Sequence, residues 1–130
     1  MSVKVNQKEI DAVLALSSER RYRYFVKVVA DRQEAWGLFS EGWALAKTDM
    51  NETVFPMWPA VEYASLCAAK EWSGYAPKSF TLDGLLNDLL PRLKRDGVLP
   101  GVFYTPQDKG VTPSVEQLVS DLRKELENYC

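Results

Sequence analysis

The chain has 130 residues and no histidine. This excludes the nucleophile–histidine pairs of serine and cysteine hydrolases, together with every metal site that depends on imidazole. The seven glycines do not have the spacing of a phosphate-binding loop or of a dinucleotide fingerprint. The side chains left for chemistry are therefore carboxylates, basic groups and a dense set of aromatic rings.

Carboxylates come first, because two that converge in a cleft can transfer protons or hold a hard divalent ion. Glu62 with Asp108 is one such pair, and Glu62 follows a Trp-Pro corner within one helical turn. Sequence spacing favours no pair over another, so solvated surface positions are expected for nearly all of these groups. A small carboxylate-dependent enzyme is thus an alternative, but the chain is not expected to be an enzyme, and neither cofactor nor metal is predicted.

Basic side chains line one face of a predicted helix. Arg20, Arg23 and Lys27 follow the i, i+3, i+7 spacing, which could present them to phosphates on RNA. A net charge of −2 opposes dedicated nucleic-acid binding, because such domains usually are basic. A solvated basic face is the expected role, and RNA binding through the Arg20 to Lys27 face is a further alternative.

The tryptophans, four in number, all fall in one stretch of the chain. Trp36 and Trp72 are expected in the core, since large aromatic residues bury the most area. Trp43 and Trp58 lie beside turns, and aromatic rings in such places also form recognition pockets. We predict that four side chains form a binding corner: Trp43, Trp58, Glu62 and Tyr104.

These groups must be held by regular elements, which the apolar pattern predicts. Helical spacing is strongest in "LDGLLNDLLPRLKR", where six leucines repeat at i, i+3, i+4, i+7, i+8 and i+11. Three short β-prone runs fill residues 35–58, "APKSF" adds an extended piece, and "LPGVFYTP" reads as a buried strand. The expected helices cover residues 7–16, 19–32, 59–72, 82–95 and 112–129.

This order, ααβββα(β)αβα, predicts one α+β domain over residues 1–130. Its sheet is expected to be antiparallel or mixed, with about four strands packed with about five helices. The sequence shows no apolar run of membrane-spanning length and no signal-peptide pattern at its start, so a cytoplasmic protein without membrane contact is expected. We expect a monomer or a weak homodimer.

Several motifs together resemble a small bacterial family known only as a domain of unknown function. They are "AWGL", "EGWALA", "FPMWPAVEYASLCA", "EWSGYAPKS", "LLPRLKRDG" and "GVFYTP". The aromatic strand, the "FPMWP" corner and the helix after it are also similar to the N-terminal domain of SseB-like proteins, which are associated with secretion or toxin-immunity contexts. The resemblance implies a compact bacterial cytosolic protein and brings no reaction or catalytic residue with it.

The function that these observations favour is a non-enzymatic binding or adaptor domain of the bacterial cytosol. Its aromatic corner would hold a protein or peptide partner. An immunity-type inhibitor is one form of this function, and it would be expected to carry an acidic surface. The expected order of the functions is therefore protein binding first, with carboxylate catalysis and RNA binding as the alternatives.

Overall fold

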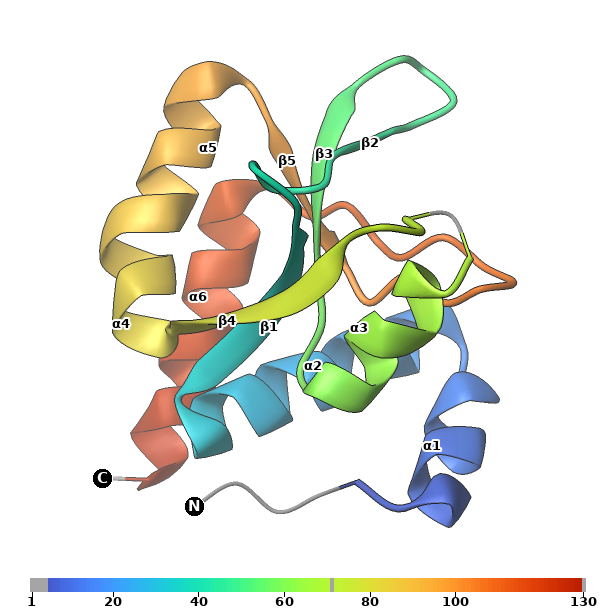
Figure 1. Ribbon diagram of the computed structural model, residues 1–130. Helices are drawn as coiled ribbons and strands as arrows, with labels where there is room; N and C mark the ends of the chain where they lie inside the picture. Colours follow the sequence, from blue (N-terminus) through green and yellow to red (C-terminus); the bar gives the residue numbers. More distant parts are fainter. Residues whose placement is uncertain (1–4, 71, 130) are drawn as a thin grey trace.

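The computed structural model describes residues 5–70 and 72–129, and the elements follow the predicted order (Figure 1). The helices are α1 (Gln7–Leu14), α2 (Ser18–Arg32), α3 (Val61–Ala68), α4 (Leu82–Gly84), α5 (Leu90–Asp96) and α6 (Val115–Leu126). The strands are β1 (Glu34–Phe39), β2 (Ala46–Lys47), β3 (Thr53–Met57), β4 (Ala76–Thr81) and β5 (Leu99–Val102). The predicted α+β class is confirmed.

Side-chain caps explain where the longer helices begin. The Asn6 side chain accepts a hydrogen bond from the Glu9 amide at 2.8 Å, and Ser17 caps α2 in the same way. Ser114 caps α6, so this helix begins at Val115 and not at the expected position 112. The helix expected over residues 59–72 is also shorter, because α3 spans only Val61–Ala68.

The leucine-rich helix is continuous but changes its winding before Pro91. A π-helical segment, Leu85–Leu89, joins α4 to α5, and the Leu90 amide donates to the Leu85 carbonyl five residues back. Proline has no N–H, and its ring would collide with the carbonyl four residues earlier in a regular α-helix. The wider turn relieves this conflict and keeps the leucines in the core.

The sheet is mixed and joins two parts. β1 pairs with β4 in antiparallel orientation, while β3 lies between antiparallel β2 and parallel β5. A bridge between Trp36 and Trp58 connects the two parts. The three β-prone runs expected over residues 35–58 form strands, but they do not pair in chain order as one antiparallel unit, because the main partner of β1 is β4.

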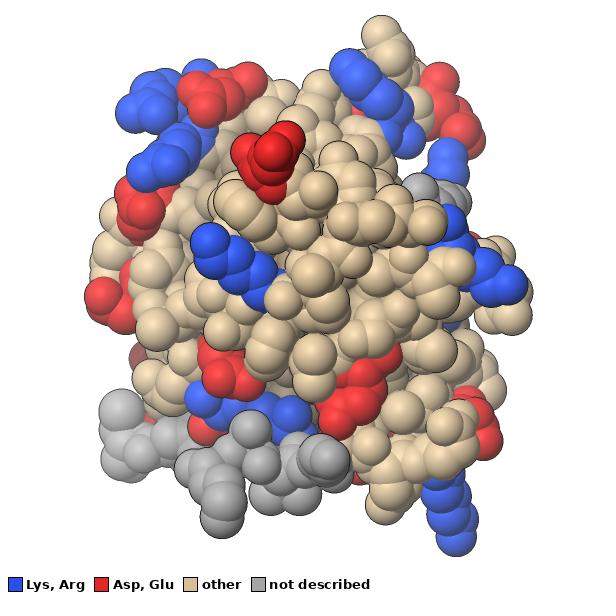
Figure 2. Space-filling view, in the orientation of Figure 1, with Lys and Arg blue, Asp and Glu red and all other residues tan. Residues whose placement is uncertain are grey.

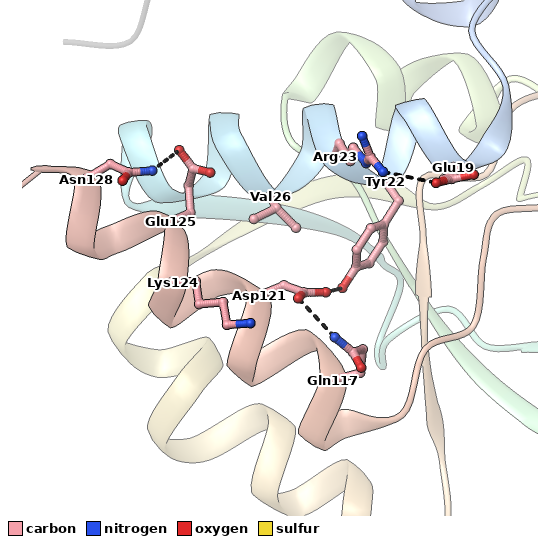
Figure 3. A pocket seen from close by; sticks show the side chains of 9 residues that line it. All are labelled: Glu19, Tyr22, Arg23, Val26, Gln117, Asp121, Lys124, Glu125 and Asn128. Carbon is pink, nitrogen blue, oxygen red and sulfur yellow. Dashed lines mark hydrogen bonds and ion pairs between the residues drawn. The ribbon is translucent and has the colours of Figure 1, made fainter.

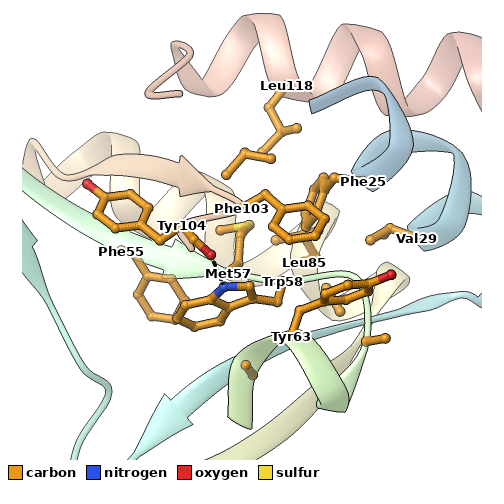
Figure 4. Packing of buried hydrophobic residues seen from close by; sticks show 14 of the residues in the cluster. Phe25, Val29, Phe55, Met57, Trp58, Tyr63, Leu85, Phe103, Tyr104 and Leu118 are labelled. Carbon is orange, nitrogen blue, oxygen red and sulfur yellow. Dashed lines mark hydrogen bonds between the residues drawn. The ribbon is translucent and has the colours of Figure 1, made fainter. Parts of the chain in front are cut away.

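The core lies between this sheet and the helices (Figure 4). In the view of Figure 1, α2 and α6 pack against each other behind the sheet, α4 and α5 stand at one side, and β4 crosses the front. Trp58, Tyr63 and Phe103 are among the largest fully buried side chains. In the described part of the chain, no helix has the length and apolar character needed to cross a bilayer.

Candidate binding site on the outer sheet edge

The centre of the predicted aromatic corner lies in the core. Trp58 has no exposed surface, and its indole N–H donates to the Tyr104 carbonyl at 2.8 Å (Figure 4). Tyr104 itself is 6% exposed. The expectation that Trp58 lines a binding corner is corrected, because this ring is buried in the core against Trp72. Glu62 is half-buried on α3, where it accepts from the Val5 amide at 3.3 Å.

Trp43 keeps a position at the surface. The Trp43 side chain is half-buried and packs across the face of β1 at Gly37. This packing requires a glycine, because a Cβ atom on residue 37 would lie 2.9 Å from the Trp43 ring. Three phenylalanines surround the indole at centroid distances of 5.2, 5.4 and 5.7 Å: Phe39, Phe55 and Phe80. Trp36, expected in the core, is half-buried and points to the opposite face of β1.

Lys78 lies on the same face as this aromatic cluster. Its side chain is exposed, and the ammonium nitrogen sits 4.1 Å from the centroid of the Phe39 ring and 5.7 Å from that of Trp43. A cation over an aromatic face is attracted by the negative charge of the π-system, which limits where the ammonium can move. Among the described residues no carboxylate forms an ion pair with Lys78.

The hydrogen bonds of β1 establish which of its peptide groups point toward β4. Trp36 exchanges two backbone hydrogen bonds of 2.8 Å with Trp58, so its peptide groups point away from β4. Peptide groups alternate in direction along a strand, and those of Gly37 therefore point toward β4. The Leu82 amide donates to the Gln33 carbonyl at 2.9 Å, which continues the same alternation at the end of the pair.

It follows that β4 has an open outer edge. The register places Lys78 opposite Gly37, so the peptide groups of Lys78 form hydrogen bonds with β1. The peptide groups of the next residue, Ser79, therefore point away from β1. Pro77 is also one of the β4 residues whose peptide groups point away from β1, so its missing N–H removes no hydrogen bond between the two strands. The unpaired groups are the Pro77 carbonyl, both peptide groups of Ser79 and the amide of Thr81. Ser79 and Thr81 are exposed, and the described part of the chain offers Ser79 no backbone partner.

The surface around this edge carries little charge. Figure 2 shows a largely uncharged area over β4 and β1, which contains one basic and one acidic side chain, with most other Lys, Arg, Asp and Glu side chains toward its rim. Leu45, two residues after Trp43, is 51% exposed. A surface with little charge next to unpaired peptide groups is suited to contact with another polypeptide.

A second concave surface lies between α2 and α6 (Figure 3), with a volume of about 530 Å³. The Tyr22 hydroxyl donates to Asp121 at 2.5 Å, and Gln117 donates to the same carboxylate. Burial raises the pKa of Tyr22, and the hydrogen bond to Asp121 raises it further. Arg23 pairs with Glu19 at 3.1 Å. These polar side chains already have hydrogen-bond or ion-pair partners within the protein. The groove therefore gives no sign of a ligand site.

The two carboxylates of the predicted pair have separate partners, and the basic face is exposed. Asp108 accepts from Arg21, a residue only 3% exposed, at 2.8 Å, whereas Glu62 bonds to the amino-terminal segment. In residues 5–70 and 72–129, no three Cys, Asp or Glu side chains are grouped so as to hold a metal ion. Cys67 is buried. Arg20 and Lys27 are exposed on α2.

Sequence reasoning missed Lys78, Phe80 and the edge formed by Ser79. The signal was present in "APKSFT", because a proline and a lysine inside a short extended run are typical of an edge strand. The pairing of β1 with β4, which brings Lys78 to Trp43, joins segments about forty residues apart and has no local pattern.

A family model described as "Protein of unknown function (DUF2750)" matches residues 22–122. The matched segment includes all five strands and hence the whole candidate site. No curated protein matches the chain.

Proposed function

Because the chain belongs to DUF2750, a family of proteins of unknown function, we propose its role from the site itself. The domain binds a partner protein by holding an extended segment of that partner against the outer edge of β4. The observation that carries this proposal is the set of outward peptide groups at the exposed residues Ser79 and Thr81, beside an aromatic surface that carries Lys78.

Added strands obtain their affinity from main-chain hydrogen bonds and their specificity from side-chain contacts. The open groups of Pro77, Ser79 and Thr81 can form about four bonds with one extended segment. The missing N–H of Pro77 ends the ladder on one side, and the cap that Thr81 provides for α4 ends it on the other. The edge is therefore suited to a short segment.

Side chains of the added strand would lie on the two faces of the sheet. Residues opposite Ser79 share the face of Trp36, and residues opposite Lys78 or Phe80 share the face of Trp43. Both tryptophans are half-buried, so each has ring surface left for a contact. This proposal keeps Trp43 from the predicted corner and replaces the buried Trp58 and Tyr104 by the edge of β4.

The experiment is selection of short random segments from a displayed library against the purified domain. Selected segments should bind the Ser79→Ala variant, which keeps the peptide N–H, and fail to bind Ser79→Pro, which lacks it. Trp43→Ala should weaken the same segments. Amide exchange followed by NMR supplies the direct readout, because a bound segment should slow exchange at Ser79 and Thr81.

The opposite results would count against the proposal. Segments that bind Ser79→Pro as well as the unaltered domain would use another surface. Bound segments that leave the exchange rate at the Ser79 amide unchanged would exclude an added strand, and a library without any binder would remove the proposed function altogether.

A further inference from the structure

We infer that Lys78 makes this edge selective for segments with a carboxylate side chain, an inference that rests on the proposed function. Lys78 is exposed, belongs to β4 itself and stands on the face where the aromatic cluster lies. The partner chemistry that fits is an extended, largely uncharged segment with one Asp or Glu facing Lys78.

To meet an added strand, the Lys78 side chain turns from the β1 side of β4, where the Phe39 and Trp43 rings lie, to the outer side. The nitrogen lies over the Phe39 ring, at 4.1 Å from its centroid, and this contact uses one side of the ammonium only. Ring contact satisfies the charge weakly and leaves the N–H donors free for a stronger acceptor. A carboxylate is that acceptor, and among the described residues none is paired with this lysine.

Strand geometry brings the two charges within reach. On an added strand, the residue opposite Lys78 would lie on the same face, but one strand spacing away, with about 5 Å between Cβ atoms. Glutamate or aspartate at that place can contact the ammonium, whereas a lysine or arginine would face a like charge. The effect on affinity is expected to be about threefold to tenfold for a partly exposed ion pair.

A second copy of the chain is the other strand that this edge could accept. If two β4 strands paired with each other in antiparallel register around Ser79, Lys78 of each copy would face Phe80 of the other. The segment Ala76–Thr81 contains no Asp or Glu, so no register of self-pairing supplies a carboxylate. The lone charge of Lys78 therefore favours a foreign acidic segment over a second copy.

The test repeats the library selection with the unaltered domain and with Lys78→Glu, and Lys27→Glu on α2 serves as a charge-matched control. Thermal unfolding confirms that each variant is folded. The unaltered domain and the control should enrich Asp or Glu at one position of the segment, and Lys78→Glu should enrich Lys or Arg at that position. Glu→Gln in a selected segment should weaken its binding about threefold to tenfold.

The failures of the two ideas can be told apart. Segments that bind the edge, lose binding to Ser79→Pro, and show no acidic position would overturn the selectivity of Lys78 and leave the proposed function standing. Self-association that is lost in Ser79→Pro, with no foreign segment selected, would assign the edge to a second copy and overturn the inference. If neither occurs, the proposed function and the inference fail together.

Discussion

Two proline substitutions at adjacent positions of β4 test the direction of its peptide groups. Lys78→Pro removes an N–H that bonds to Gly37, whereas Ser79→Pro removes an N–H that faces solvent. Gly37 is buried, so its carbonyl would lose its partner without gaining water. A buried acceptor left unpaired costs about 1–3 kcal/mol, and the lost cation–π contact adds about 0.5–1 kcal/mol.

The expected free energy of unfolding therefore falls by about 1.5–4 kcal/mol in Lys78→Pro. In Ser79→Pro it should stay within about 0.5 kcal/mol, because no ladder bond is lost and the outward position already tolerates Pro77. Urea unfolding followed by tryptophan fluorescence measures both values. Lys78→Ala separates the cation–π contribution, since it removes the ammonium and keeps the peptide N–H.

The variant that loses more free energy of unfolding shows which residue of β4 is bonded to β1. Greater destabilisation in Ser79→Pro would mean that Ser79 and not Lys78 is bonded to β1, and equal destabilisation would contradict the assigned direction of the peptide groups. The outer edge would then expose a different set of peptide groups, and the site proposed for partner binding would have to be abandoned.

Other predictions concern the packing around the site. Asp108→Asn should lower the free energy of unfolding by about 1–3 kcal/mol, because the buried Arg21 loses its charged partner; urea titration measures it. The raised pKa of Tyr22 means that the folded state holds this proton longer than the unfolded state, so stability should fall as pH rises above about 10. Tyr22→Phe should reduce that fall in urea midpoints, and an unchanged pH dependence would contradict it. Gly101→Ala should cost about 1–3 kcal/mol, measured by thermal unfolding, since its methyl would overlap Val54.

The sequence allowed the order of elements to be predicted, because that order depends on local patterns. Asn6 before a helical repeat and six leucines at helical spacing are each readable within a few residues. The exposure of the tryptophans depends on which strands pair, and that is a long-range property. Trp58 lies beside a turn, as Trp43 does, but its indole N–H donates to a carbonyl that lies 46 residues further along the chain.

The residues that discourage uncontrolled pairing at the outer edge of β4 would also limit which segments this edge can bind. Proline and lysine on an edge strand discourage uncontrolled pairing between chains, and Pro77 and Lys78 stand side by side in β4. With Pro77 unable to donate, an added strand gains only about four main-chain bonds, each worth about 0.5–1.5 kcal/mol net. This barely offsets the loss of translational and rotational freedom, about 4 kcal/mol or more. The proposed binding therefore depends on side-chain contacts with Trp43 and Lys78, and we expect that a partner without matching side chains is not bound.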